Sequence, residues 1–211
     1  MAQRKGEQKR VRDAPQTRKR MLEAARELFV RNGYGATTLK EVADRAGVAV
    51  QTIYFTFGNK RVLLKELVDV AIAGDLEPVA TMDRPWFQEA VAAPAAEAHL
   101  RLHVGGTRRI LERVAPIVEM LRAAAAADPA IAGQWDDPVD PRFAVHLEAA
   151  RSLVAKPGLR AGVTAEHTAD LLFVLLSPEL YQLFVRDRGW SPERWEKWAG
   201  DTLVSQLCQD G

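Results

Sequence analysis

The pattern of apolar and polar positions predicts helices along most of the chain. In residues 17–32 apolar side chains recur at helical spacing, and no segment shows the sustained alternation of a half-buried strand. Residues 1–16 are instead polar and basic, with Pro15 among them, so we expect a disordered arm there. The chain is therefore expected to be all-α.

Two short helices joined by a tight turn are predicted between residues 37 and 60. Thr38 is a good N-cap, and the positions after it that share one helical face are all apolar: Leu39, Val42, Ala43 and Ala46. Gly47 then stands where a helix end requires a left-handed residue. A second helix, roughly 50–56, follows within three residues. This arrangement is a helix-turn-helix, whose second helix enters the major groove of DNA.

The same stretch carries a more specific set of residues. They are Thr37-Thr38-Leu39, Val42-Ala43, Ala46-Gly47-Val48, Thr52-Ile53-Tyr54, Phe57 and Lys60. Over about residues 17–66 the chain thereby resembles the amino-terminal domain of the TetR/AcrR family of bacterial transcriptional regulators. It departs from the family pattern at Gly58, where a polar or basic residue is common, and at Phe55-Thr56, which replaces a frequent aromatic pair.

The resemblance implies an all-α fold of about nine helices. An N-terminal three-helix domain with the helix-turn-helix would precede a C-terminal helical domain that binds a ligand and dimerises. We therefore expect a basic disordered arm at 1–16, a DNA-binding domain at 17–66, and an effector-binding and dimerisation domain at 67–211.

Proline, glycine and capping residues predict where the later helices begin and end. A helix of about 20 residues, roughly 30 Å long, should start near Lys60. Gly105-Gly106 should kink or split the helix that follows Pro94, and Ser177-Pro178 should kink a later one. The remaining predicted ranges are 95–113, 115–127 opened or bent by Pro116, 140–155, 165–187, and a last helix capped by Ser191.

Charge is unevenly distributed along the chain. Residues 1–65 contain 15 Lys and Arg against 6 Asp and Glu, whereas residues 66–211 contain 14 against 22. A basic head of this kind attracts the phosphates of DNA and makes binding sensitive to salt. A merely solubilising surface is the alternative explanation, which the helix-turn-helix inside the head makes less attractive.

Other sequence features exclude several classes of protein. Cys208 is the single cysteine, so no disulfide forms within the chain, and a reducing cytoplasm is expected. The first 20 residues are too charged for a signal peptide, and the apolar run Leu171 to Leu176 is too short to cross a bilayer. No phosphate-binding glycine loop or nucleophile elbow is present, so we expect no enzyme, no cofactor and no membrane partner.

The residues expected to contact DNA lie at the two helix starts. Gln51 and Thr52 are the best candidates to contact bases, since glutamine pairs with adenine and the threonine methyl suits thymine. Thr38 can hold a phosphate at a helix N-terminus. The resemblance implies phosphate contacts for Tyr54 and Lys60, although the Tyr54 ring can equally brace the first helix. Further contacts are expected from Val50, Phe55 and Arg18, and from the basic residues Arg10, Arg12, Lys19 and Arg20, which follow the backbone, enter the minor groove or remain solvated.

The final two long helices have the pattern of an interface. The last helix carries an apolar stripe, and the one before it is apolar on more than one face, so it needs covering on two sides. In the TetR/AcrR family this pair of helices forms a four-helix dimer interface, and ordinary core packing is the alternative. The residues expected there are Leu172, Leu176, Leu180, Phe184, Trp195, Trp198, Thr202 and Leu203.

Aromatic, methionine and histidine residues of the body are candidates to line a pocket for a small-molecule effector. The resemblance implies such a pocket, and a mostly apolar lining favours a hydrophobic or aromatic compound. The candidates, for which core packing is the alternative, are Trp86, Phe87, His99, His103, Met120, Trp135, Phe143 and His146. The three histidines are poor candidates for a metal site, because no cysteine or further ligand accompanies them at helical spacing.

The sequence thus predicts a cytoplasmic homodimer that represses transcription at a palindromic operator and is released by an effector. An activator or an effector-independent regulator of the same fold is an open alternative. A nonspecific DNA-binding protein is another, as is a helical enzyme using the histidine cluster with a metal.

Overall fold

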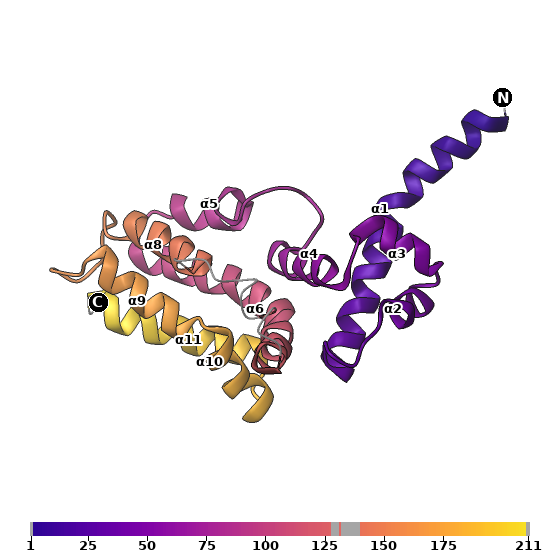
Figure 1. Cartoon of the computed structure of the whole chain (residues 1–211). Helices are drawn as coiled ribbons and strands as arrows, with labels where there is room; N and C mark the ends of the chain where they lie inside the picture. The colour runs from indigo at the N-terminus through magenta and orange to yellow at the C-terminus, as the bar shows by residue number, and fades with distance from the viewer. Residues whose placement is uncertain (1, 128–130, 132–139, 210–211) are drawn as a thin grey trace. The chain divides into compact units, whose positions relative to one another are not determined.

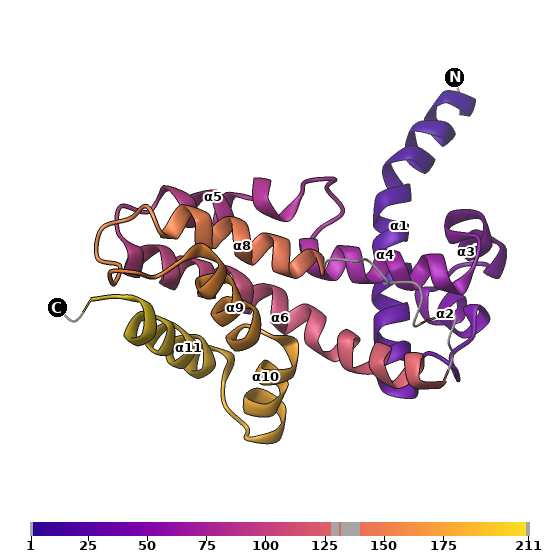
Figure 2. The same cartoon turned by 60° about the vertical axis from the view of Figure 1, so that its left-hand side comes forward.

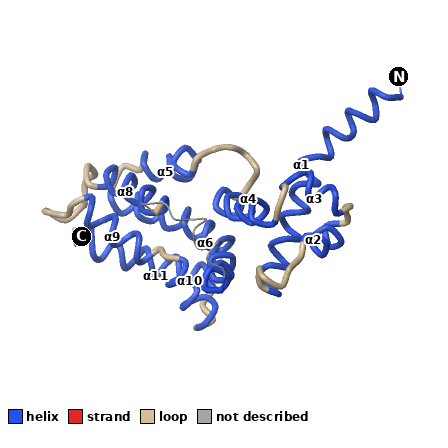
Figure 3. The backbone as a smooth tube through the Cα atoms, viewed as in Figure 1, coloured by secondary structure: helices blue, strands red, loops and turns tan. Residues whose placement is uncertain are grey.

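The computed structural model describes residues 2–127, 131 and 140–209, with side chains described from Ala14 onward. Helices joined by loops make up this part of the chain, and no strand occurs in it (Figure 3). Its only extended pairing is an isolated bridge between Leu159 and Cys208. The predicted all-α fold is confirmed.

The first helix is longer than the sequence pattern indicates. Helix α1 spans Ala2–Asn32 and includes the residues expected to form a disordered arm (Figure 1). Lys, Arg, Gln and Glu are favourable helix formers, and extending an existing helix costs far less than starting one. The helix ends as predicted at Gly33, whose φ of 86° is left-handed. Its expected inward residues are all buried: Met21, Leu22, Ala25, Leu28 and Phe29.

The helix-turn-helix forms as predicted. Helix α2 spans Leu39–Ala46 and packs against α1, and α3 spans Val50–Phe57 and packs against α2. Helix α4, at Lys60–Ala73, is shorter than the roughly 20 residues expected. It stops because Gly74 takes a φ of 89°, from which a right-handed helix does not continue.

Beyond α4, the 3₁₀ turn η1 at Thr81–Asp83 leads into α5 at Pro85–Ala92. Helix α6 then runs unbroken through Ala96–Ala127, so Gly105-Gly106 and Pro116 do not split it as expected. Gly106 serves close packing instead. A Cβ atom on Gly106 would lie 2.0 Å from Cε3 of Trp86, because that indole ring packs directly on the helix backbone.

The remaining helices complete the body (Figure 2). Helix α8 spans Pro141–Leu153 and begins with the predicted Asp140 cap, whose carboxylate accepts a hydrogen bond from the Arg142 amide. Where one kinked helix was expected at 165–187, there are three pieces: α9 at Ala165–Leu175, α10 at Pro178–Gln182 and the π-helical turn η3 at Leu183–Asp187. Pro178 starts a new helix because it has no N–H to continue the old one. Helix α11, at Pro192–Leu207, is capped by Ser191 as predicted.

The chain divides into two compact units, one made of Met1–Ala71 with Ile117–Gln134 and the other of Ile72–Pro116 with Trp135–Gly211. In the second unit α8 packs against α5 and α9, and α11 packs against α9. The functional division at residues 66 and 67 stays a prediction. Within the described ranges, one stretch, Ala165–Asp187, has the length and composition of a membrane span, with 33% of its most apolar window buried. Composition of this kind is weak evidence, and the backbone there is broken at Pro178.

Candidate nucleic-acid interface and ligand site

A reciprocal cap at the start of α2 sets the geometry of the helix-turn-helix. The Thr38 hydroxyl accepts a hydrogen bond from the Glu41 amide at 3.2 Å, and the Thr38 amide donates to Glu41 Oε2 at 2.7 Å. Gly47, with φ 66°, closes the other end and donates to Asp44 O at 3.2 Å. The amide and the hydroxyl of Thr38 both donate to the Glu41 carboxylate, and they hold its pKa below the usual value. The carboxylate therefore occupies the helix N-terminus at which Thr38 was expected to hold a phosphate.

Helix α3 separates a buried face from an exposed one. Ile53 and Phe57 are buried against the rest of the unit. On the other face Gln51 is exposed, Tyr54 is 54% exposed and Phe55 is 94% exposed. Thr52 and Val50 are half-buried. A large apolar side chain with nearly all of its surface in water is unusual, and it indicates a surface that is covered by another molecule.

Lys60 has a structural contact in place of the free ammonium expected for phosphate binding. Its Nζ atom donates to Tyr34 O at 2.5 Å and to Thr37 O at 2.6 Å. The ammonium also lies 4.1 Å from the centre of the Tyr34 ring. Burial lowers the pKa of Lys60, and Glu41 acts in the opposite direction. Lys60 thus fastens the start of α4 to the loop between α1 and α2, because its ammonium donates to two carbonyls of that loop.

Arg18 is likewise engaged within the unit. Its guanidinium forms a bidentate ion pair with Glu66 on α4 and lies 5.2 Å from the centre of the Phe57 ring. The paired carboxylate raises the Arg18 pKa. Arg18 therefore joins α1 to α3 and α4, which argues against the predicted DNA contact. The side chains of Arg10 and Arg12 lie outside the described residues.

Five of the eight predicted pocket residues come together in the second unit. His103 lies at the centre: its ring centre is 5.8 Å from that of Trp86, 6.1 Å from Phe87, 6.3 Å from His99 and 5.3 Å from His146. His103 Nε2 and His146 Nδ1 are hydrogen-bonded at 3.1 Å. We call these five residues the histidine cluster.

The three histidines of the cluster are neutral at pH 7. Burial lowers the pKa of His99 to about 4 and that of His146 to about 3, with smaller contributions from Lys156 and Arg142 respectively. Burial also lowers the His103 pKa well below its usual value. No group of three or more potential metal ligands occurs within the residues that the structure describes.

The other three predicted pocket residues are not part of the cluster. Phe143 packs edge-to-face on Phe173, with ring centres 5.6 Å apart. Met120 is buried in the first compact unit, because the part of α6 that begins at Ile117 belongs to that unit. Trp135 lies outside the described residues.

The predicted interface residues fall on two faces of the second unit. Leu172, Leu176, Trp195 and Leu203 are at most 1% exposed, so they are core residues of the chain itself, and a partner cannot contact them. Leu180, Phe184, Trp198 and Thr202 are half-buried. The misassignment follows from α11, where the apolar residues at 195, 199, 203 and 207 point inward and the neighbouring positions form a separate outer face.

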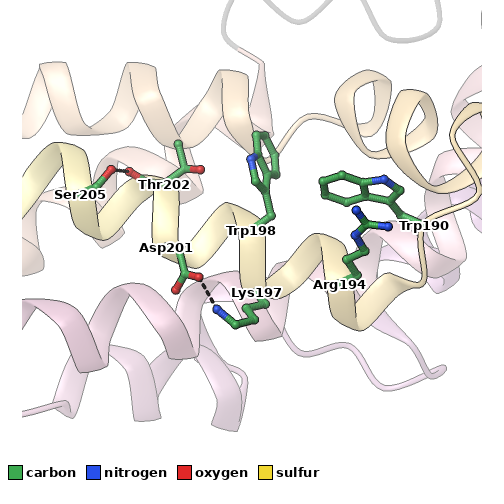
Figure 4. A pocket seen from close by; sticks show the side chains of 7 residues that line it. All are labelled: Trp190, Arg194, Lys197, Trp198, Asp201, Thr202 and Ser205. Carbon is green, nitrogen blue, oxygen red and sulfur yellow. Dashed lines mark hydrogen bonds and ion pairs between the residues drawn. The ribbon is translucent and has the colours of Figure 1, made fainter.

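That outer face contains a shallow groove with a volume of about 430 Å³ (Figure 4). Trp198 and Trp190 stand along it, and the Arg194 guanidinium lies 4.0 Å from the centre of the Trp190 ring. Phe184 packs against both tryptophans, with ring centres 4.5 Å from each. Val174 and Leu183, on α9 and η3, are 61% and 54% exposed. We call these two residues with Phe184, Trp190 and Trp198 the outer apolar face.

Comparison with known proteins supports the resemblance of the amino-terminal domain to the TetR/AcrR family. Residues 21–67 match the family described as "Bacterial regulatory proteins, tetR family". The uncharacterised HTH-type transcriptional regulator YvkB of Bacillus subtilis (strain 168) is 48% identical over 52 residues, which cover 25% of this chain and 28% of YvkB. The repressor KstR of Mycolicibacterium smegmatis is 34% identical over 120 residues, 56% of this chain and 55% of KstR.

The likeness extends to the whole fold. The structure of the SmeT–triclosan complex superposes with a TM-score of 0.68 at 20% identity, covering 92% of this chain and 93% of SmeT. Residues 21–67 form a DNA-binding domain of the TetR family, and the chain as a whole has the fold of the SmeT structure. The alignments with the two curated relatives cover only about a quarter and about half of those proteins, so what the relatives do is not established for the whole of this chain.

Two features of this chain were missed from the sequence. The capping box was readable, because Glu41 follows Thr38 at the spacing that defines it. The contact between Trp190 and Arg194 on the outer apolar face could not be predicted from the sequence, because Trp190 lies in the loop before α11, outside any periodic pattern.

Proposed function

We propose that the protein is a sequence-specific DNA-binding regulator of transcription, acting as a homodimeric repressor that a small molecule releases from its operator. The observation that carries the proposal is the exposed face of α3, where Gln51, Tyr54 and Phe55 project from a helix fixed by buried Ile53 and Phe57. The excess of positive charge in residues 1–65 supports it. A regulator of this kind acts on the chromosome, which supports a cytoplasmic location.

Sequence-specific binding is tested by fluorescence anisotropy with the DNA that flanks the protein's own gene and with a scrambled duplex, across a series of salt concentrations. We expect a preference of about a thousandfold for the specific duplex. Equal affinity for both duplexes, with a steep dependence on salt, would indicate a nonspecific DNA-binding protein unless genome-wide footprinting finds an operator elsewhere.

Gln51→Ala tests the base contact. We expect a loss of about 1–3 kcal/mol on the operator and little change on scrambled DNA. Gln206→Ala is the matched control, because Gln206 is an exposed glutamine on α11, outside the DNA-binding head. Equal losses for Gln51→Ala on both duplexes would contradict a role in base recognition.

Phe55 is proposed to contact the methyl group of a thymine, because its ring is almost fully exposed on the recognition helix and thymine is the base with an apolar group in the major groove. Replacing one thymine at a time by deoxyuridine removes only that methyl group. At one position we expect a loss of about 0.8 kcal/mol, or fourfold, for the unmodified protein. The variant Phe55→Ala should bind both forms of that duplex equally. A methyl effect that persists in Phe55→Ala would assign the contact to another residue, such as Val50.

The outer apolar face is proposed to bind a second copy of the chain, so that two α3 helices meet the two halves of a palindrome. Light scattering should give a dimer for the unmodified protein. Val174→Asp with Leu183→Asp should give a folded monomer, because both side chains are exposed and contribute little to the core. Val79→Asp, at a residue that is 38% exposed in the chain before η1, is the control. A dimer that survives the double substitution would place the interface elsewhere.

A further inference from the structure

The histidine cluster contains buried ring nitrogens that have no hydrogen-bond partner among the described residues. His99, His103 and His146 are 1%, 1% and 3% exposed. Both ring nitrogens of His99, Nδ1 of His103 and Nε2 of His146 have no hydrogen-bond partner among the described residues. Burying an unpaired polar atom costs folding free energy, so a ligand that supplies hydrogen-bond partners to these nitrogens would recover part of that cost.

The hydrogen bond between His103 and His146 determines what the pair can offer a ligand. Since both rings are neutral, a single hydrogen lies between Nε2 of His103 and Nδ1 of His146. If His103 donates it, His103 Nδ1 is an acceptor and His146 Nε2 carries a hydrogen. If His146 donates it, the two outer atoms exchange roles. In both tautomers the pair has one donor and one acceptor, at its two opposite ends, and neutral His99 also has one of each; a hydroxyl group, which both donates and accepts, can pair with any one of these nitrogens.

The surroundings of the three histidines are aromatic and apolar. Trp86 and Phe87 contribute two rings next to His103, and Trp86 is the half-exposed member of the cluster. Trp86 is therefore the side from which a ligand can enter. A flat apolar molecule with one polar group satisfies both the rings and the ring nitrogens.

The charges near the cluster are positive, which disfavours a cationic ligand. Lys156 acts on His99 and Arg142 acts on His146. Both cations are already engaged: the Lys156 ammonium donates to Val91 O and Ala93 O, and the Arg142 guanidinium lies 3.9 Å from the centre of the Phe173 ring. A buried carboxylate ligand would therefore lack a free partner, and an uncharged hydroxyl is less costly to bury.

We propose that His99, His103 and His146 form the hydrogen-bonding side of a binding site for an uncharged aromatic hydroxyl compound, a phenol, with Trp86 and Phe87 as its aromatic walls. The expectation that a bound phenol releases the protein from DNA rests on the proposed function. The binding of the phenol does not depend on that function.

The ligand class is tested with four single-ring compounds of similar size: 4-methylphenol, p-xylene, 4-methylbenzoate and 4-methylbenzylammonium. Calorimetry on the full chain should give a dissociation constant for 4-methylphenol at least about tenfold lower than that for each of the others. Tighter binding of the benzoate or of the ammonium compound would overturn the uncharged class. Equal binding of 4-methylphenol and p-xylene, or no binding of either, would overturn the histidines as hydrogen-bonding partners.

His99→Leu separates a binding role from a packing role. Removing a buried unpaired imidazole should leave the melting temperature of the free protein unchanged or raise it, while the preference for 4-methylphenol over p-xylene falls at least about threefold. Thr168→Val is the matched control, because Thr168 is fully buried on α9 and its hydroxyl also has no partner among the described residues. Thr168→Val should likewise leave the melting temperature unchanged or raise it, and it should not change the preference for 4-methylphenol over p-xylene.

A preference for 4-methylphenol that is unchanged in His99→Leu would overturn the proposal. His146→Phe makes the same test from α8 if His99→Leu fails to fold. The DNA measurements separate the proposed phenol site from the proposed regulatory function. If the protein binds specific DNA but shows no preference for 4-methylphenol, the proposed phenol site is wrong and the proposed regulatory function stands. If it prefers 4-methylphenol but the compound does not release DNA, the phenol site stands and its coupling to DNA binding is wrong.

Discussion

The substitution Gly106→Ala tests the packing of Trp86 on the backbone of α6. A Cβ atom at residue 106 would lie 2.0 Å from Cε3 of Trp86 and 2.6 Å from Cδ2 and Cζ3. Ordinary carbon contacts are near 3.5–4.0 Å, so the rigid indole must move by about 1.5 Å or more. Overpacking costs about 1–3 kcal/mol, and a clash this close with a rigid ring belongs in the upper part of that range, at about 2–3 kcal/mol.

The helix itself gains from the same substitution, since alanine is favoured over glycine in a helix interior by about 1 kcal/mol. The net expectation for Gly106→Ala is a loss of about 1–2 kcal/mol in the free energy of unfolding. For a chain of this length that corresponds to a melting temperature lower by roughly 2–8 °C.

Gly105→Ala is the matched control, one residue away on the same helix. Its Cβ would meet the Glu196 carboxylate at 3.0 Å, the flexible end of a side chain that can move aside. Gly105→Ala should therefore be neutral or stabilising by up to about 1 kcal/mol. Urea unfolding of the two variants side by side measures the difference.

A double substitution completes the test. With Trp86→Ala in the background, the steric conflict is gone, and Gly106→Ala should become stabilising by about 1 kcal/mol. The reasoning is refuted if Gly106→Ala is as stable as the unmodified protein, or if its effect is the same with and without Trp86.

Two further predictions follow from buried contacts. Lys60→Ala should destabilise the helix-turn-helix domain by about 1–2 kcal/mol in urea unfolding, because the carbonyls of Tyr34 and Thr37 lose the hydrogen bonds from the ammonium. Lys65→Ala is the control: it removes an exposed ion pair with Asp69 on the same helix and should cost less than about 0.5 kcal/mol. A uniform loss of DNA affinity in Lys60→Ala without a loss of stability would show a phosphate contact instead. The free energy of unfolding should also decrease as the pH falls from about 6.5 toward 4. In the folded chain burial lowers the pKa of His99 to about 4 and that of His146 to about 3, so both stay neutral over most of this range. In the unfolded chain the same histidines take up protons below their usual pKa, which favours unfolding. Unfolding free energies measured across this range should give a shallower slope for His99→Leu, and an unchanged slope would show that His99 is not the titrating group.

The helix ends and the DNA-binding motif were predictable because the interactions that define them are local. The Thr38 cap, the left-handed Gly47, the Asp140-Pro141 start of α8 and the Ser191 cap all join atoms only a few residues apart. The capping box is equally local, because Glu41 lies three residues after Thr38.

The roles of particular side chains depended on contacts between distant parts of the chain. Lys60 and Arg18 have the residue types and positions of phosphate-binding groups, yet their partners are Tyr34, Thr37 and Glu66, which no periodic pattern brings close to them. The interface prediction was partly wrong for a related reason. Periodicity finds an apolar stripe but does not say whether the chain itself or a partner covers it, and Trp195 is buried by the chain itself.

By itself the sequence determined the all-α class, the family of the DNA-binding domain and most helix starts, since spacing and capping act within a few residues. Only the tertiary structure decided that Gly105-Gly106 continues a helix and that Phe55 is exposed where Phe57 is buried. It alone shows that three histidines from α6 and α8 meet in the interior with unpaired nitrogens. Each of these facts depends on which surfaces pack together over long sequence separations, and burial, not residue type, sets the chemistry of such groups.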